Sequence, residues 1–168
     1  MSILNRLNIF FIFLVCYQIL SGHLSIVSAS HTTYLSNTEL NLLGITSYEN
    51  INPNLLVYPL KRVTEEIKFN LLFSKEQKKE YVYDLYEIRL RELVFIINNK
   101  KEGFIFFAAD RYNSFVGKLK TEFPSDVNKK LRIKAAIKLL ERLRDIYPAN
   151  SLYWNKIQQT IDTTRSLI

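Results

Sequence analysis

The stretch YEIRLRELVFI places two oppositely charged residues on the apolar side of a predicted helix. Arg89 and Glu92 are three positions apart, and residues at this spacing are neighbours on a helix surface and can form an ion pair. A charge inside a core is costly unless it is paired and hydrogen-bonded. The spacing therefore predicts a partly buried ion pair that sets the register between helices. The same face carries four apolar residues at helical spacing: Val82, Leu85, Leu93 and Ile96.

An acidic residue of the preceding helix is expected to join this pair. Glu65 and Glu66 are the two candidates, because either carboxylate can meet Arg89 where the first helix packs on the second. The alternative is that this face is only half covered, so that Arg89 and Glu92 both extend to water along their apolar stems.

A row of three lysines at intervals of four residues is the second charged pattern: Lys130, Lys134 and Lys138. The row lies opposite the apolar stripe of its predicted helix, where solvent-exposed charge is ordinary. Attraction to anionic lipid headgroups is worth about 1 kcal/mol per basic residue near a membrane surface. The row is therefore either a solvated face or a contact for an anionic surface.

The residue types give little support for nucleophilic catalysis, metal binding or phosphate binding. The chain has one cysteine and two histidines, and only His31 remains after residue 29, which excludes Cys–His and Ser–His nucleophiles and His/Cys metal sites. Its four glycines form no phosphate-binding loop. An enzyme that uses two of the 16 acids is the alternative, but the acids in TEEI and KKEY have the pattern of solvated faces. We therefore expect a non-enzymatic protein without a cofactor.

Residues 1–29 have the order of a secretory signal peptide. They hold one positive charge, then an apolar run, then Val27 and Ala29 at the −3 and −1 positions of a cut before Ser30. The apolar run is nearly long enough to cross a bilayer, so an uncleaved signal anchor is the alternative. Either way, we expect the body of the protein to be extracytoplasmic, secreted or associated with the cell envelope.

The net charge of +7 bears on the partners. Outside the cytoplasm a basic protein meets lipid headgroups and anionic envelope polymers rather than nucleic acid. Membrane contact is then expected only through the signal segment or weak electrostatics. A composition typical of an AT-rich genome would also raise the lysine content without any binding role, and this explanation carries more weight.

The rest of the chain divides into a polar leader and a helical domain. Residues 30–53 show no sustained period and are expected to be partly ordered. Residues 54–168 show five amphipathic patterns, no strand alternation and no solenoid repeat. Short connections place neighbouring helices antiparallel, so the predicted fold class is all-α, an antiparallel bundle of about five helices. The helices are expected over 55–72, from a capping box at Ser74 and Gln77 to 97, over 104–122, from a cap at Ser125 to 147, and over 151–168.

Apolar residues at helical spacing support four of these helices. The stripe of the first helix is Leu60, Val63, Ile67 and Leu71. The inward residues expected for the third are Ile105, Ala108, Tyr112, Phe115, Leu119 and Phe123. Those of the fourth are Ile133, Ala136, Ile137, Leu140, Leu143 and Tyr147, and those of the last are Tyr153, Ile157, Ile161 and Thr164.

Two phrases give the chain a resemblance to a known family. LVYPLKRVTEEI, which includes Tyr58 to Arg62, precedes a capped helix with RLRE, and Tyr112 and AAIKLLERLRDIYP follow in order. Residues 50–168 thereby resemble exported prokaryotic all-helical proteins catalogued as a domain of unknown function. The resemblance implies an exported helical fold and supplies no catalytic residue. The chain departs from the family at Tyr86, where a small residue is usual, which suggests a wider gap between the first two helices.

These observations favour a non-enzymatic helical protein of the cell envelope that binds a protein or an anionic polymer. The alternative is an envelope stress sensor or chaperone like the small periplasmic hairpin proteins. Those carry a leucine–threonine–any–any–glutamine phrase at a helix start, which Phe73, Ser74 and Gln77 resemble. A plain capping box explains this resemblance more simply.

Overall fold

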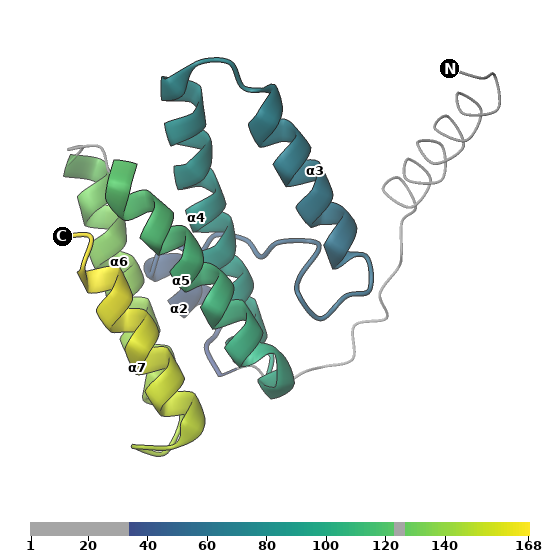
Figure 1. Cartoon of the computed structure of the whole chain (residues 1–168). Helices are drawn as coiled ribbons and strands as arrows, with labels where there is room; N and C mark the ends of the chain where they lie inside the picture. Colours follow the sequence, from purple (N-terminus) through teal and green to yellow (C-terminus); the bar gives the residue numbers. More distant parts are fainter. Residues whose placement is uncertain (1–33, 123–126) are drawn as a thin grey trace. The chain divides into compact units, whose positions relative to one another are not determined.

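The computed structural model describes residues 34–122 and 127–168, and among these the only regular structure is helical (Figure 1). The all-α class with a helical bundle is thus confirmed. The predicted signal peptide at 1–29, the inward position Phe123 and the cap at Ser125 lie outside the described residues. The helices are α2 (Asn37–Leu42), α3 (Tyr58–Leu71), α4 (Lys75–Asn98), a 3₁₀ turn (Glu102–Phe104), α5 (Ile105–Glu122), α6 (Val127–Arg144) and α7 (Leu152–Arg165).

Helices α4 to α7 build the core. Helix α4 packs on α5 and α6, and α7 packs on the same two helices from the other side, which closes a ring of four. Short connections join α4 to α5 and α6 to α7, so the helices of each pair run antiparallel (Figure 1). The inward residues expected for α5 and α6 and described by the structure are all buried, as are Ile157, Ile161 and Thr164 of α7.

Local sequence explains where two of these helices begin. The capping box at Ser74 is formed, because its hydroxyl accepts a hydrogen bond from the Gln77 amide at 3.0 Å and its own amide donates to the Gln77 side chain at 3.4 Å. The hydroxyl of Ser151 caps α7 by accepting from the Trp154 amide at 3.2 Å.

The segment before α3 is more ordered than its sequence indicates. Ser36 and Glu39 form a capping box that starts α2, and Leu35, Leu40 and Ile45 are buried in the main core. From Tyr34 on, this segment belongs to the same compact unit as the helices, so the structure shows no domain boundary at residue 54. The buried residues are five apart, which is neither a helix nor a strand period, and this is why no pattern revealed them.

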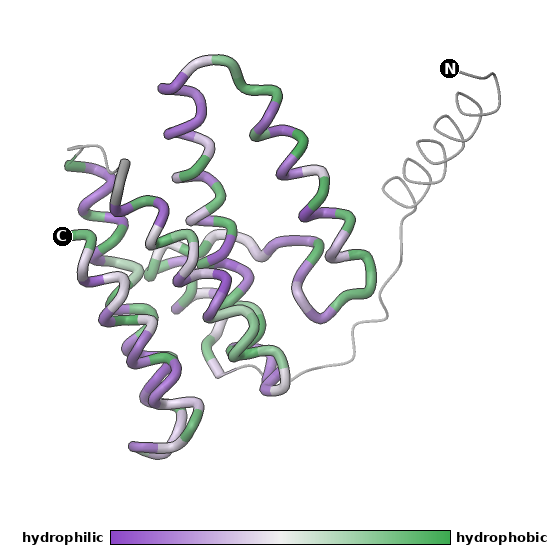
Figure 2. The backbone as a smooth tube through the Cα atoms, viewed as in Figure 1, coloured by the Kyte–Doolittle hydropathy of each residue, from purple (hydrophilic) through white to green (hydrophobic). Residues whose placement is uncertain are grey.

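The apolar face of helix α3, which its sequence pattern marks as buried, is exposed in the structure. The helix pairs with α4 as a hairpin (Figure 1), and hydrophobic residues recur along it (Figure 2). The stripe that ordinarily marks a buried face points to solvent instead: Leu60, Val63, Ile67 and Leu71 are 43%, 55%, 52% and 64% exposed. Tyr58 and Glu65 are the buried residues of α3. Polar chemistry therefore fastens this helix to α4.

Candidate functional site: a buried ion network and three surface features

The predicted pair of Arg89 and Glu92 lies inside the protein. Each residue is 1% exposed, and Nη1 of Arg89 is 2.5 Å from Oε1 of Glu92. Neither side chain extends to water. The helix face that carries them is covered by α3, as a buried ion pair requires.

Helix α3 supplies the partners of this pair. Glu65 accepts a hydrogen bond from Nη2 of Arg89, and the same carboxylate pairs with Arg62 at 2.7 Å. Glu66 is exposed and takes no part, so of the two candidate acids the structure selects Glu65. The selection follows from the helix geometry, because Glu65 lies on the side of α3 that carries Tyr58 and Glu66 lies one position round the helix toward the exposed stripe.

Two further groups of α3 bind Glu92 and were not expected. The hydroxyl of Tyr58 donates to Oε2 at 2.7 Å, and the ammonium of Lys61 donates to Oε1 at 2.7 Å. Lys61 also pairs with Glu49 at 3.2 Å. Tyr58, Lys61 and Arg62 belong to the stretch YPLKR and Arg89 and Glu92 to the stretch RLRE, so these two parts of the sequence meet in space.

The charges of this network reinforce one another. Burial alone would lower the pKa of Arg89, but Glu92, Tyr58 and Glu65 more than offset it and raise the pKa above its ordinary value. Burial, together with the negative charge of Glu92, raises the pKa of Tyr58 well above its usual range. Both groups keep their protons at neutral pH, and each oxygen of Glu92 accepts at least one hydrogen bond. Such a carboxylate is suited to positioning helices rather than to moving protons.

Arg111 of α5 lies beside this network. Its guanidinium sits between two aromatic rings, 4.6 Å from the centroids of Tyr58 and Phe107. Burial, and the nearby positive charges of Arg62 and Arg89, lower its pKa. Arg111 thus links α5 to the α3–α4 hairpin through ring stacking.

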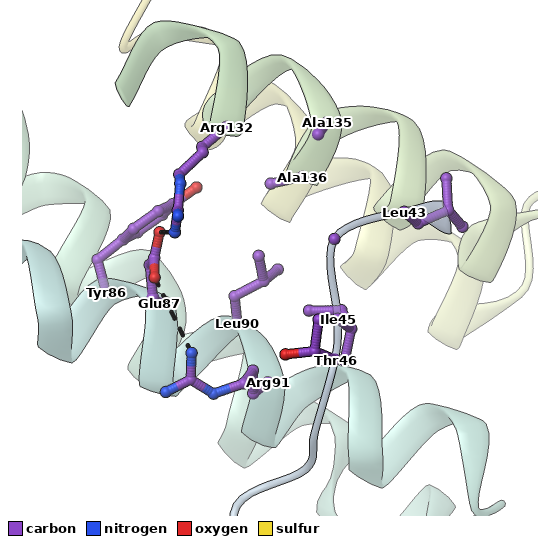
Figure 3. Close-up of a pocket in the computed structure, with 11 residues that line it drawn as sticks. Leu43, Ile45, Thr46, Tyr86, Glu87, Leu90, Arg91, Arg132, Ala135 and Ala136 are labelled. Carbon is purple, nitrogen blue, oxygen red and sulfur yellow. Dashed lines mark hydrogen bonds and ion pairs between the residues drawn. The ribbon is translucent and has the colours of Figure 1, made fainter. Parts of the chain in front are cut away.

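A groove of about 380 Å³ opens on another side of α4 (Figure 3). It lies between the chain that follows α2, helix α4 and helix α6. Its charged groups are tied to one another: Glu87 pairs with Arg132 at 2.7 Å and with Arg91 at 3.9 Å, and Arg91 also pairs with Glu49 at 2.8 Å. Each charge in the groove thus has a partner within the protein.

Tyr86 lines this groove and packs toward α5. Its ring lies 5.4 Å from that of Tyr112, whose hydroxyl contacts those of Tyr86 at 3.2 Å and Thr164 at 3.0 Å. Tyr86 therefore fills space inside the bundle, and it does not separate α3 from α4.

The lysine row forms an exposed face of α6. Lys130, Lys134 and Lys138 are exposed and pair with no acid among residues 34–122 and 127–168. Val127 and Leu131, 70% and 58% exposed, lie on the same face. The other cations of the helix are each paired: Lys129 with Glu80, Arg132 with Glu87, Arg142 with Glu39 and Arg144 with Asp145.

The described part of the chain has neither a candidate metal centre nor a candidate membrane-spanning helix. No group of three or more His, Cys, Asp or Glu side chains there could hold a metal ion. No helix there is long and apolar enough to cross a membrane. Comparisons of the chain with family models, with curated proteins and with solved structures found no match.

Proposed function

We propose that the protein is an exported, non-enzymatic helical module of the cell envelope that binds an anionic polymer through the outer face of α6. The observation that carries this proposal is the row of Lys130, Lys134 and Lys138, exposed and without an acidic partner in the described part of the chain. A protein that neutralises four cations of one helix and leaves three in a line presents a surface for an external polyanion.

The shape of the row favours a linear polymer. Residues four apart on a helix are about 6 Å apart along its axis, so the three ammonium groups span about 12 Å in a line. A small anion would be bound by converging charges, whereas a line of charges matches a chain with regularly spaced phosphate or carboxylate groups. Leu131 lies on the same face and is 58% exposed, so it can contact hydrocarbon groups of a polymer that carries them.

The buried network supports a non-catalytic role. Glu92 and Glu65 are fixed by Arg89 and by cations of α3, and the groove beside α4 has its charges paired internally. The export part of the proposal is supported by the signal-like order of residues 1–29 and by the resemblance to exported helical proteins.

Binding of linear polyphosphate and of poly-glutamate, measured by sedimentation at several salt concentrations, tests the proposal. Replacement of all three row lysines by Gln should weaken binding at least about tenfold and flatten its salt dependence. The matched control carries the same charge change at three scattered exposed lysines, Lys75, Lys100 and Lys120. It should bind nearly as well as the unaltered protein.

Three results would count against the proposal. Equal losses in the two variants would show that only net charge matters. Binding of anionic vesicles without binding of either polymer would assign the row to lipid headgroups. Absence of binding at low salt would leave the row as a solvated face.

A second candidate, an envelope chaperone, is favoured by the exposed apolar stripe of α3. Exposed apolar side chains offer adaptable contact to an unfolded client. Light scattering of an aggregating client distinguishes the two functions. Failure to suppress aggregation at stoichiometric ratios would exclude the chaperone, and suppression that is lost in Ile67→Glu and kept in the lysine variant would favour it.

A further inference from the structure

The outer face of α3 is a continuous apolar stripe. Its four residues, Leu60, Val63, Ile67 and Leu71, are between 43% and 64% exposed, and Leu56 and Phe73, just outside the two ends of the helix, are 99% and 95% exposed. Monomeric soluble proteins rarely expose contiguous apolar patches of more than a few hundred Å². This arrangement indicates a surface that another structure covers.

The buried network holds α3 in this orientation. Rotation of α3 by half a turn would bury the stripe, but it would strip Arg89 of Glu65, and Glu92 of Tyr58 and Lys61. Uncompensated buried charges make that alternative costly. The network therefore holds the inner side of α3 on α4, and the apolar stripe faces outward, away from the bundle, where a partner can reach it.

The spacing of the stripe suits a second helix. Within α3, Leu60, Val63 and Ile67 follow one another at intervals of three and four residues, the heptad spacing at which two helices interlock along a seam. A helix of 14 residues is about 21 Å long, so paired α3 helices would form a short seam.

The charges at the edges of the stripe identify the kind of partner. Glu66 lies at one edge and Lys68 at the other, about equally far round the helix from the centre of the stripe. The Lys68 ammonium rests 4.6 Å from the centroid of the Tyr81 ring of α4. A lipid-binding helix would carry basic residues on both edges. In a parallel pair of identical helices, the Glu66 edge of one meets the Lys68 edge of the other, so this stripe is complementary to itself.

We propose that the outer face of α3 is the interface of a homodimer in which the α3 helices of two copies of this chain pair in parallel. The dimer has a two-fold axis along the paired helices, and each contact occurs twice. It places two α6 lysine faces on one particle, which would strengthen attachment to a repeating polymer through avidity. The dimer does not depend on the polymer proposal, since the two surfaces belong to different helices.

Sedimentation equilibrium over a range of concentrations tests the dimer. The unaltered protein should approach twice the mass of one chain with increasing concentration, and Ile67→Glu should remain at the mass of one chain. Leu131→Glu is the matched control: Leu131 is also an apolar residue on an outer helix face and is exposed to a similar degree, 58% against 52%. It should dimerise like the unaltered protein. Because Ile67 is exposed, Ile67→Glu should keep the helical circular dichroism and the unfolding midpoint measured on the monomer.

A cysteine at Val63 tests the orientation. With Cys16 replaced by Ser, Val63→Cys should form a disulfide-linked dimer under mild oxidation, because equivalent residues meet along the seam of a parallel pair. Cysteine at Lys134 in the same background should not cross-link.

A protein that stays at the mass of one chain at all concentrations would overturn the dimer, as would a dimer unaffected by Ile67→Glu. Vesicle binding by a monomer that Ile67→Glu abolishes would do the same and would assign the stripe to lipid. None of these results changes the polymer binding expected for each chain. Failure of the dimer proposal would therefore not imply failure of the polymer proposal.

Discussion

The hydroxyl of Tyr58 accepts a hydrogen bond from Nη1 of Arg89 at 3.2 Å, across 31 positions of the sequence. The same hydroxyl donates to Glu92 at 2.7 Å. One phenol thereby joins both members of the buried pair on α4 and anchors the first turn of α3. Helix α3, whose apolar side faces water, is thus held in place by hydrogen bonds and ion pairs.

Removal of the Glu92 charge should destabilise the protein strongly. Glu92→Gln leaves Arg89 and Lys61 without their shared anion, and breaking a buried ion pair by loss of one partner costs about 3–5 kcal/mol. Denaturant unfolding measures the loss. Glu66→Gln is the control, since Glu66 is exposed and outside the network, and it should cost less than about 0.5 kcal/mol. A loss for Glu92→Gln as small as that of the control would contradict the structural role.

An apolar replacement of the pair should recover part of this loss. In Arg89→Met with Glu92→Leu no unpaired charge remains on α4, so the double variant should be more stable than Glu92→Gln. Recovery should be incomplete, because Lys61 and the hydroxyl of Tyr58 lose their acceptor. Denaturant unfolding measures the stabilities of the two variants. A double variant less stable than Glu92→Gln would contradict the expectation.

Helix α3 should open before the four-helix bundle. Its backbone is protected mainly by the polar network, whereas α5 and α7 lie in the apolar core. We expect amides of α3 to exchange with deuterium at least about tenfold faster than those of α5 at low protein concentration. Tyr58→Phe removes two buried hydrogen bonds and should widen the difference. Tyr153→Phe on α7, whose ring packs on Tyr147, should leave α3 unchanged, and equal protection of α3 and α5 would refute the expectation.

Alkaline pH should unfold the protein through its buried tyrosines. Burial raises the pKa of Tyr112 from its ordinary value to about 12, and it raises those of Tyr58 and Tyr86 as well. The folded state therefore holds these protons where the unfolded chain releases them, so the stabilisation is complete below pH 10 and is lost as the pH rises toward the folded pKa. The free energy of unfolding should fall by about 1.4 kcal/mol per pH unit for each such tyrosine. The last part of the phenolate absorbance should appear together with the loss of circular dichroism above pH 10, and Tyr112→Phe should reduce the slope of the free energy of unfolding. Complete phenolate formation in a still-folded protein would contradict this.

Asn98 should hold the segment before α2 in place. Its side chain accepts from the amide of Leu35 at 2.6 Å and donates to the carbonyl of Leu35 at 3.0 Å and to the hydroxyl of Tyr48 at 2.7 Å. Asn98→Leu leaves these groups without partners and should cost about 1–3 kcal/mol. Limited proteolysis should then cut near Tyr48 sooner than in the unaltered protein. The exposed Asn155 provides the control, and Asn155→Leu should resist the protease normally.

The bundle was predictable because its helices carry apolar stripes that must be buried. Periodicity located α4 to α7 to within a few residues, and the short connections gave their antiparallel order. The pair of Arg89 and Glu92 was predictable for the same reason, since two charges interrupted a stripe whose other members had to face inward. Glu65 was one of two candidates, and only the orientation of α3 selects it.

Sequence patterns could not give that orientation. A stripe such as Val63 and Ile67 marks an apolar face without stating whether this chain or another structure covers it. The contacts of Tyr58 and Lys61 with Glu92 could not be predicted, because Glu92 lies more than 30 positions away and a single hydroxyl or ammonium group produces no periodic pattern. Helix α2 was missed because six residues are too few to show a period, although Ser36 and Glu39 have the capping-box spacing.

The clamp between Asn98 and Leu35 has a mechanical consequence. The backbone of Tyr34 also donates to the carbonyl of Asn98, at 3.2 Å, so two consecutive residues are tied to the end of α4. Tension that reaches the body along the chain before Tyr34 therefore passes directly into the last turn of α4. Residues 36–94, which include α2, α3 and most of α4, form a loop outside this load path. Their polar network and outward stripe would keep their shape under a steady pull until the hydrogen bonds of Asn98 rupture.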